Sequence, residues 1–231
     1  MMATGAAKQM KTHDTTDVAI IGAGPSGAAA AAWLARRGIN VRVIERQRFP
    51  RFSIGESLLP QCMVHLEACG LLDAVQTGDF QFKNGAAFTW RDRYAAIDFR
   101  DKFSPGPGTT WQVERADFDQ RLIDGARQAG ASVEFETQVE AFVADHDRPS
   151  LTLVDANGEQ RSLQARFVLD ASGYGRVLAR LTGLARPSTL ESRCALFTHI
   201  EDRIDCSHYD RDKILIGLHP EHSGIWYWLI P

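Results

Sequence analysis

The stretch DVAIIGAGPSG, residues 17–27, decides the fold that the sequence predicts. Its first half is an apolar, β-branched run typical of a buried strand, and its second half has the spacing G-x-G-x-x-G. Residues 28–37 are strong helix formers that end at Gly38, and residues 40–44 form a second apolar run that leads to Glu45. Strand, glycine turn, helix and strand predict a Rossmann-like βαβ unit that binds a dinucleotide.

The three glycines of this turn have separate physical tasks. Gly22 allows the tight turn, Gly24 lets the backbone approach a pyrophosphate, and Gly27 permits close packing of the helix. The helix N-terminus, where Ser26 lies, offers free N–H groups and a positive dipole end to a phosphate. Glu45 is expected to accept hydrogen bonds from the ribose hydroxyls of an adenosine. NAD and FAD both contain adenosine diphosphate and fit this unit alike, and a turn that serves only helix packing is the alternative.

Composition restricts the partners that the chain can have. The 231 residues are 44% hydrophobic and 24% charged, which supplies enough apolar material for one sizeable core or for a core with a second lobe. The net charge is −3, with acidic and basic residues interspersed, so neither a nucleic acid nor a membrane surface is an expected partner. No apolar run reaches the length of a membrane span. We therefore expect small-molecule partners.

Cysteine and histidine usage indicates a reducing compartment and no metal site. The four cysteines form no C-x-x-C pair, which fits free thiols in the cytoplasm better than a disulfide framework. The segments 206–208 and 219–222 contain possible metal ligands, but neither has a second ligand pair at zinc spacing. The sequence predicts a cytoplasmic protein without a bound metal.

Further elements follow the βαβ unit. Residues 58–72 are predicted to form a helix, and residues 80–99 are predicted to form two or three strands. Residues 115–129 have the pattern of an amphipathic helix that stops at Gly130, and residues 132–136 follow as a third parallel strand.

The second half of the chain predicts a small antiparallel meander and a second, antiparallel lobe. Asn157-Gly158 favours a type I′ hairpin turn within the meander, residues 166–170 return to the main sheet, and a short helix ends near residue 181. The predicted meander strands are 139–143, 151–155 and 160–163, and the predicted strands of the second lobe lie near 195–200, 213–218 and 225–230.

Several motifs, in chain order, carry a resemblance to a known family. They are the G-x-G-x-x-G turn, the segment R-F-S-I-G-E-S-L-L-P at 51–60, R-A-D-F-D at 115–119, D-A-S-G at 170–173 with L-A-R at 178–180, and W-Y-W-L-I-P at 226–231. Together they resemble the flavin-dependent halogenases, of the tryptophan and phenol halogenase type, within the FAD-dependent oxidoreductase superfamily. The resemblance implies an α/β fold, in which a glutathione-reductase-type, Rossmann-like FAD-binding domain with a β-meander precedes the start of an antiparallel β-sheet substrate lobe.

The turn and the resemblance together imply a set of cofactor contacts. Arg51 and the Gly55-Glu56-Ser57 segment precede a helix, Arg115 matches an arginine that reaches the cofactor, and Val139 matches a position whose backbone contacts adenine. A solvent-facing residue at a helix start is the alternative for Arg115. The expected cofactor-binding residues are Gly22, Gly24, Ser26, Gly27, Glu45, Arg51, Gly55, Ser57, Arg115, Val139 and Asp170.

Lys83 is the candidate catalytic residue. A lysine on a strand is usually a solvated charge, but Phe82 and Ala86 belong to an apolar stretch, so the ammonium lies either at an edge or in a pocket where it acts as a positioned proton donor. In flavin-dependent halogenases a lysine in a similar strand segment holds or captures hypohalous acid and delivers halogen to the substrate. By this resemblance Lys83 has that role.

Trp226 and Trp228 are candidates for a partition between flavin and substrate. Side chains two residues apart on a strand point to the same face, so the two indoles would form one aromatic wall. The resemblance implies that this wall separates the flavin from the organic substrate. A Trp-rich core strand is the alternative.

The function implied is that of an enzyme, a halogenase that uses reduced FAD, dioxygen and halide. A separate flavin reductase would supply the reduced FAD, and the substrate would be an electron-rich aromatic compound, either free or tethered to a carrier. A flavin monooxygenase or a geranylgeranyl-reductase-like flavoprotein of the same fold is one alternative, and an inactive FAD-binding fragment is another. The sequence leaves open which substrate is used, and whether chloride or bromide is used.

The expected domain organisation has three parts. We expect a disordered leader at residues 1–16, an FAD-binding domain at 17–185 with inserted strands at 80–114, and the start of a substrate lobe at 186–231. The family continues past W-x-W-x-I-P into a segment with a G-D motif, so the chain is expected to be the N-terminal portion of a longer protein.

Overall fold

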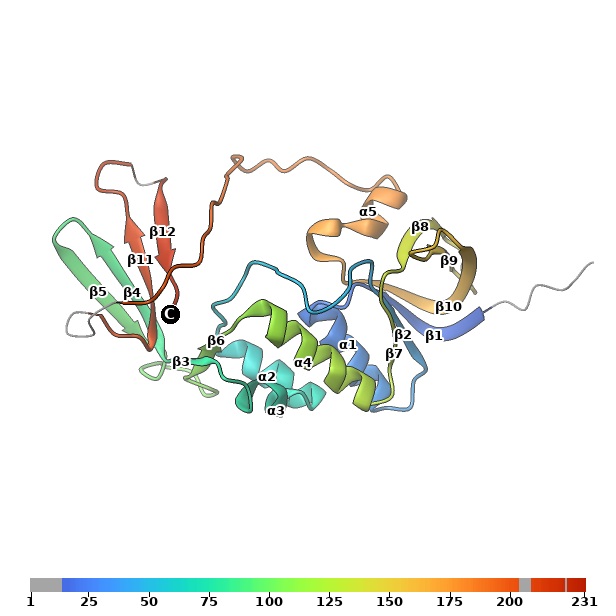
Figure 1. Cartoon of the computed structure of the whole chain (residues 1–231), viewed down its shortest axis with the longest axis horizontal. Helices are drawn as coiled ribbons and strands as arrows, with labels where there is room; N and C mark the ends of the chain where they lie inside the picture. Colours follow the sequence, from blue (N-terminus) through green and yellow to red (C-terminus); the bar gives the residue numbers. More distant parts are fainter. Residues whose placement is uncertain (1–13, 204–208, 223) are drawn as a thin grey trace, which may run out of the picture.

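The computed structural model describes residues 14–203, 209–222 and 224–231 (Figure 1). Figure 1 shows a larger body that contains a sheet and a layer of helices, a smaller body built on a second sheet, and an extended segment that crosses between them. The predicted leader lies mostly outside the described residues. Residues 14–16 of it are paired, because the first strand begins at Asp14 and extends along its parallel neighbour.

The larger body contains a six-stranded sheet. Its strands, in spatial order, are β7 (Ser132–Glu134), β2 (Val41–Ile44), β1 (Asp14–Ile21), β10 (Gln160–Asp170), β9 (Ser150–Val154) and β8 (Gln138–Val143). The pairs between β7, β2, β1 and β10 are parallel, and those between β10, β9 and β8 are antiparallel. The predicted Rossmann-like sheet with an attached meander is confirmed.

Helices cover one face of this sheet. They are α1 (Pro25–Ala35), α2 (Gln61–Cys69), α3 (Leu72–Gln76) and α4 (Arg115–Gln128). In α1 the buried residues are glycine and alanine, whose small side chains let the helix lie close to its neighbours, and α1 packs against α4. The amphipathic α4 buries Phe118, Leu122, Ile123 and Ala126 in the same core, as its pattern predicts.

Three local predictions were wrong in detail. The helix predicted at 58–72 is divided into α2 and α3 at Gly70, whose φ of 71° is left-handed and ends α2. The strands predicted at 160–163 and 166–170 are one continuous strand, β10. The hairpin turn is not type I′, because Asn157 keeps a negative φ; the amide of Gly158 donates to the carbonyl oxygen of Asp155 at 3.0 Å, and Gly158 itself has a φ of 80°.

The smaller body is built on a four-stranded sheet. Its strands, in spatial order, are β12 (Trp226–Leu229), β11 (Lys213–Leu218), β4 (Gly85–Trp90) and β5 (Arg93–Asp98). The strands predicted near 213–218 and 225–230 are present, but the lobe is not purely antiparallel, since β11 runs parallel to β4. Residues 195–200 do not form a strand; they belong to the extended segment, where their side chains are exposed and no neighbouring strand pairs with them.

A two-stranded sheet lies beside α4 where the two bodies meet (Figure 1). It pairs β3 (Gln81–Lys83) with β6 (Thr110–Gln112) in antiparallel register, and β3 leads directly into β4. The segment 80–114 that was predicted as an insertion therefore supplies this small sheet and half of the four-stranded sheet. The short helix near residue 181 is α5 (Val177–Leu181), which follows a 3₁₀ turn at Gly173–Gly175.

We predict that Gly27→Ala destabilises the protein by about 1–3 kcal/mol, because a Cβ at this position would stand 1.9 Å from the carbonyl oxygen of Gly22. Gly24→Ala is the matched control. Its Cβ would meet only the Arg51 guanidinium at 3.5 Å, and Gly24 has a φ of −64°, so we expect a loss below about 1 kcal/mol. Urea unfolding without added ligand measures both. Equal losses in the two variants would contradict the role given to Gly27.

Candidate functional site

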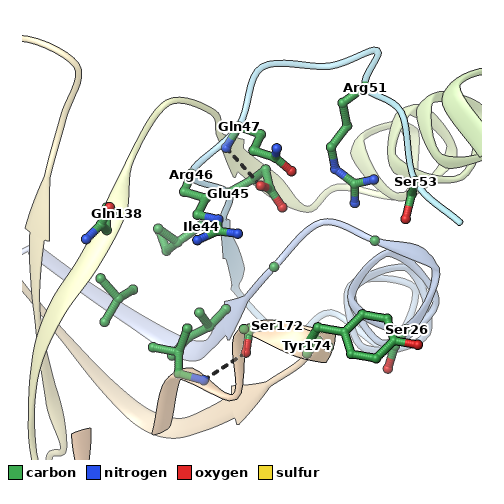
Figure 2. Close-up of a pocket in the computed structure, with 18 of the residues that line it drawn as sticks. Ser26, Ile44, Glu45, Arg46, Gln47, Arg51, Ser53, Gln138, Ser172 and Tyr174 are labelled. Atoms are coloured by element: carbon green, nitrogen blue, oxygen red, sulfur yellow. Dashed lines mark hydrogen bonds between the residues drawn. The ribbon is translucent and has the colours of Figure 1, made fainter. Parts of the chain in front are cut away.

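A cavity of about 650 Å³ lies at the carboxyl ends of the parallel strands β1 and β2. Figure 2 shows the side chains that line it, which come from the glycine turn, the end of β2, the loop after β2, β8 and the loop after β10. This is the edge of an open α/β sheet at which ligands bind. Its volume lies in the range of small-molecule and cofactor sites.

The glycine turn forms one wall of the cavity. Gly22 has a φ of 102° and turns the chain from β1 toward α1, and Gly24 is the N-cap of that helix. A Cβ on Gly24 would enter space that only the Arg51 guanidinium borders, so the backbone here is open to a ligand. Ser26 also lines the cavity, in the first turn of α1, where unpaired N–H groups favour an anion. The turn therefore has the cradle that a diphosphate requires.

Glu45 is buried at the end of β2 and lines the cavity. Its Oε2 accepts a hydrogen bond from the backbone amide of Ala23 at 2.9 Å, and its Oε1 accepts one from the amide of Gln47 at 2.8 Å, which is drawn in Figure 2. These bonds fix the carboxylate against the turn. Each oxygen retains a lone pair for a further hydrogen bond, and the binding of ribose hydroxyls by Glu45 stays a prediction.

Two arginines give the cavity a positive charge beside the glycine turn. Both Arg51 and Arg115 line the cavity and pair with the fully buried carboxylate of Asp119. Arg51 reaches one Asp119 oxygen at 3.1 Å, and Arg115 makes a two-point contact at 2.7 and 2.9 Å. One carboxylate against two guanidinium groups leaves a net positive charge, and the buried Nε of Arg51 makes no hydrogen bond within the described residues. This donor set fits the phosphates of a dinucleotide.

Asp119 is a residue that the sequence analysis missed. Arg115 and Asp119 stand four residues apart on α4, the spacing at which opposite charges meet on a helix, and this was the available signal. The contribution of Arg51 from a loop far away in sequence had no local signal. The solvent-facing alternative for Arg115 is wrong, because its side chain is largely buried, and its Nη1 also donates to the carbonyl oxygen of Ile54 at 2.6 Å.

Some of the other predicted cofactor residues line the cavity, and others do not. Val139, on β8, lines it, whereas Gly27 is buried in the contact between α1 and the turn. Asp170 does not line it; its carboxylate accepts from the amides of Ser172 at 3.0 Å and Leu178 at 2.8 Å, and so holds the loop after β10. Ser172 of that loop does line the cavity, as Figure 2 shows.

Gly55 and Ser57 lie next to the cavity without lining it. Gly55 has a φ of 103° and lies beside the Arg115 guanidinium, which a Cβ on Gly55 would approach to 3.2 Å. The Ser57 side chain is directed away, toward β3 and β6, where it accepts a hydrogen bond from Lys83 at 2.8 Å. The structure therefore brings Ser57 together with the candidate catalytic residue.

Lys83 is buried, with only 2% of its surface exposed. Its Nζ donates to Ser57 Oγ at 2.8 Å and to the carbonyl oxygen of Leu58 at 2.7 Å, and the Phe99 ring centroid lies 5.3 Å away. Burial lowers the pKa of Lys83 from its usual value to about 8, against a smaller opposing effect of the Cys62 thiol. Lys83 does not line the cavity, but it is a held ammonium and not the solvated strand lysine that was the alternative.

Trp226 and Trp228 lie on one face of β12, with ring centroids 6.4 Å apart. They are 39% and 54% exposed. Neither indole lines the cavity. The guanidinium of Arg193 lies 5.1 Å from the Trp226 ring centroid, so this aromatic face is bordered by a cation from the extended segment.

The described residues contain no cluster of three or more Cys, His, Asp or Glu side chains that could hold a metal ion. Cys206 and His208, which the sequence analysis considered as ligands, lie outside the described residues. In the part of the chain that the structure describes, no helix has the length and apolar character needed to cross a membrane.

Comparison with known proteins gives related sequences over most of the chain. The family described as "FAD binding domain" matches residues 15–226. A chlorinase of 1H-pyrrole-2-carbonyl-peptidyl-carrier protein from Pseudomonas fluorescens is 31% identical over 96% of this chain and 54% of its own length. A tryptophan 2-halogenase from Chondromyces crocatus is 31% identical over 74% of this chain and 32% of its own length. The chain thus spans about half the length of these curated relatives, or less.

Solved structures agree with these sequence matches. A flavoprotein/dehydrogenase from Cytophaga hutchinsonii is 44% identical, with a TM-score of 0.89 over 94% of this chain and 53% of that one. The flavin-dependent halogenase CmlS is 28% identical, with a TM-score of 0.76 over 96% of this chain and 40% of that one. The chain belongs to the FAD-binding domain family, and the relatives it resembles include flavin-dependent halogenases.

Proposed function

We propose that this chain is the FAD-binding part of a halogenase that uses reduced FAD, dioxygen and halide to halogenate an electron-rich aromatic substrate. Its halogenase relatives support the reaction class, and the residues of the cavity support the cofactor. The observation that carries the halogenation step is Lys83, a buried ammonium on β3 that is held by two hydrogen bonds.

The residues of the cavity bind and orient the cofactor. The open backbone at Gly24 and the positive charge of Arg51 and Arg115 receive the diphosphate, and Glu45 accepts from the ribose of the adenosine. Val139 lies on β8 at the adenine end. When bound, reduced FAD supplies, together with dioxygen, the oxidising power that converts halide to hypohalous acid.

Lys83 positions the hypohalous acid for transfer. An ammonium has three N–H groups, of which two donate to Ser57 and Leu58, so one remains for the oxygen of hypohalous acid. The aromatic ring carbon forms a bond to the halogen while the bond between halogen and oxygen breaks. Lys83 gives its proton to the departing oxygen, which leaves as water, and the proton lost by the ring carbon restores the ammonium. The aromatic face of Trp226 and Trp228 keeps the substrate apart from the cofactor.

The substrate, the reductase and the compartment complete the proposal. One relative acts on a pyrrole tethered to a peptidyl carrier protein and another on tryptophan, so we propose an aromatic substrate that is either free or carrier-bound. A separate flavin reductase supplies reduced FAD, and the enzyme works in the cytoplasm.

A second candidate function is that of an FAD-dependent oxidoreductase that does not halogenate. The flavoprotein/dehydrogenase favours it, since its identity of 44% exceeds that of the halogenases described above.

We predict that the protein binds FAD and that Gly24→Ala weakens this binding at least about tenfold, because its Cβ would occupy the space where the diphosphate approaches the backbone. Flavin fluorescence titration gives the dissociation constant, and the unfolding curve of the free protein serves as the control. Binding of nicotinamide dinucleotides with no binding of flavin would overturn the assignment of the cavity.

We predict that Lys83→Met in the full-length protein lowers the yield of halogenated product by at least about a hundredfold, while FAD binding and oxidation of reduced FAD continue. Methionine fills much of the buried volume without the amine. Lys102→Met is the matched control, since Lys102 is exposed and donates to the carbonyl oxygens of Gly106 and Pro107 in a loop. Mass spectrometry of the product with and without halide measures the yield.

Retained halogenation in Lys83→Met would remove this residue from the mechanism. A product without halogen in the unmodified protein would favour the second candidate.

The pH dependence of halogenation tests which form of Lys83 is active. Its pKa is lowered to about 8, so the ammonium is present below that pH and is lost as the pH rises through it. Because Lys83 is held as a donor, we predict that the halogenated product formed per reduced FAD consumed is highest below about pH 8 and falls above it. A yield that rises above pH 8 would show that the neutral amine carries the halogen.

A further inference from the structure

Ser57 and Lys83 belong to a small buried polar layer. The segment around Ser57 lies along β6 like an added strand: the amide of Leu58 donates to the carbonyl oxygen of Trp111 at 3.2 Å, and that of Val113 donates to Glu56 at 2.7 Å. On the other side of β6, Lys83 of β3 lies opposite Thr110. The Lys83 side chain therefore reaches across β6 to the segment that carries Ser57.

The hydrogen bonds of this layer run in one direction, from Lys83 to Gln112. The carbonyl oxygen of Leu58 can only accept, so Nζ donates to it at 2.7 Å. Ser57 Oγ accepts from Nζ at 2.8 Å, and its one O–H then donates to Oε1 of Gln112 at 3.2 Å. This turns the Gln112 amide so that its buried Nε2 makes no hydrogen bond within the described residues. An unpaired buried N–H is unfavourable, and in return this orientation of Gln112 gives the Ser57 hydroxyl an acceptor.

We propose that Ser57 and Gln112 are positioning residues for Lys83, and that the direction of the hydrogen bonds from Lys83 through Ser57 to Gln112 follows the protonation of Lys83. When the amine loses its proton, its nitrogen can accept from the Ser57 hydroxyl. Ser57 Oγ can then accept from Nε2 of a rotated Gln112, which satisfies the unpaired donor. The catalytic meaning of this arrangement rests on the proposed function of Lys83 in halogen transfer.

The remaining groups around Lys83 leave Ser57 and the Leu58 carbonyl as its hydrogen-bond partners. The Cys62 thiol on α2 and the Phe99 ring also lie near Lys83. Thr110 is fully buried on the same face of the small sheet, but its hydroxyl makes no hydrogen bond within the described residues. Lys213, on β11 of the four-stranded sheet, is paired with Asp210 and Asn84. Ser57 is therefore the one side-chain acceptor recorded for the Lys83 ammonium among the described residues.

The test measures the protonation of Lys83 directly, without the halogenation reaction. Full-length protein labelled with ¹³C and ¹⁵N in lysine is titrated by NMR, and the Nζ signal of Lys83 is assigned by its loss in Lys83→Met. Ser57→Ala removes an acceptor of the charged form, so we expect the titration midpoint to fall by about one pH unit. Ser57→Thr keeps a hydroxyl and should restore most of the midpoint. Gln112→Leu should move the midpoint in the same direction as Ser57→Ala, but by less.

Thr110→Val is the matched control. It removes a buried hydroxyl from the same small sheet, but one without a hydrogen bond, and we expect the midpoint to stay within about 0.3 pH units of the unmodified protein. An unchanged midpoint in Ser57→Ala, or an equal shift in Thr110→Val, would overturn the proposal. So would a large loss of FAD affinity in Ser57→Ala without a shift of the Lys83 midpoint, because that result would make Ser57 a cofactor contact.

These outcomes are separate from the fate of the proposed function. If Lys83→Met still halogenates while Ser57→Ala shifts the midpoint, Lys83 has no part in halogen transfer but Ser57 still positions it. If Lys83→Met stops halogenation and Ser57→Ala leaves the midpoint unchanged, the proposed function stands and the positioning role fails. Far-UV circular dichroism of each variant confirms that the fold is retained.

Discussion

The contact between Gly27 and the carbonyl oxygen of Gly22 is the constraint on which the FAD site depends. A Cβ on Gly27 would stand 1.9 Å from that oxygen, so α1 starts as close to the end of β1 as two segments of backbone can lie. This closeness places the N-terminus of α1 at the carboxyl edge of the sheet. Gly24 then faces the cavity with open backbone, and Glu45 on the neighbouring strand is near enough to bind the amide of Ala23. The positions that we propose for the ribose and the diphosphate thus follow from one packing contact.

A buried carboxylate organises the charge around that turn. Asp119 has no access to solvent, and an unpaired charge there would be strongly unfavourable, so its two arginine partners are structurally required. Arg115 comes from the same helix, whereas Arg51 comes from the loop after β2, and the shared carboxylate joins this loop to α4. Because two positive groups share one negative group, the wall keeps a positive charge that adds to the dipole of α1. The proposed phosphate site therefore has two sources of positive charge, the arginine pair and the N-terminus of α1. The arginine pair is needed in any case, because it neutralises the buried Asp119.

The features that could be predicted from sequence are those with local signals. The turn at Gly22, the apolar face of α4 and the strands of the meander each depend on residues that are neighbours in the chain, and the structure has all three. The pairing of β11 with β4 is different, because it joins segments that are separated by a whole domain and has no local pattern. The direction of the Ser57 side chain could not be predicted from local sequence either. Its segment marks a loop near the cofactor, but its partner lies on β3, and only the folded sheet decides which way the hydroxyl points.

The loop after β2 connects the two parts of the proposed active site. Near its start, Arg51 lines the cofactor cavity, and the carbonyl oxygen of Ile54 accepts from Arg115 at 2.6 Å. A few residues later, Ser57 and Leu58 provide the two oxygens that hold the Lys83 ammonium. Desolvation alone favours the neutral amine, whereas these two oxygens stabilise the ammonium. Because they accept two of its three N–H groups, they also fix the direction of the third. Since one loop carries both sets of contacts, it joins Lys83 to the cavity proposed for the cofactor, and the extended segment that crosses between the two bodies (Figure 1) packs on the same loop through Phe197 against Phe52.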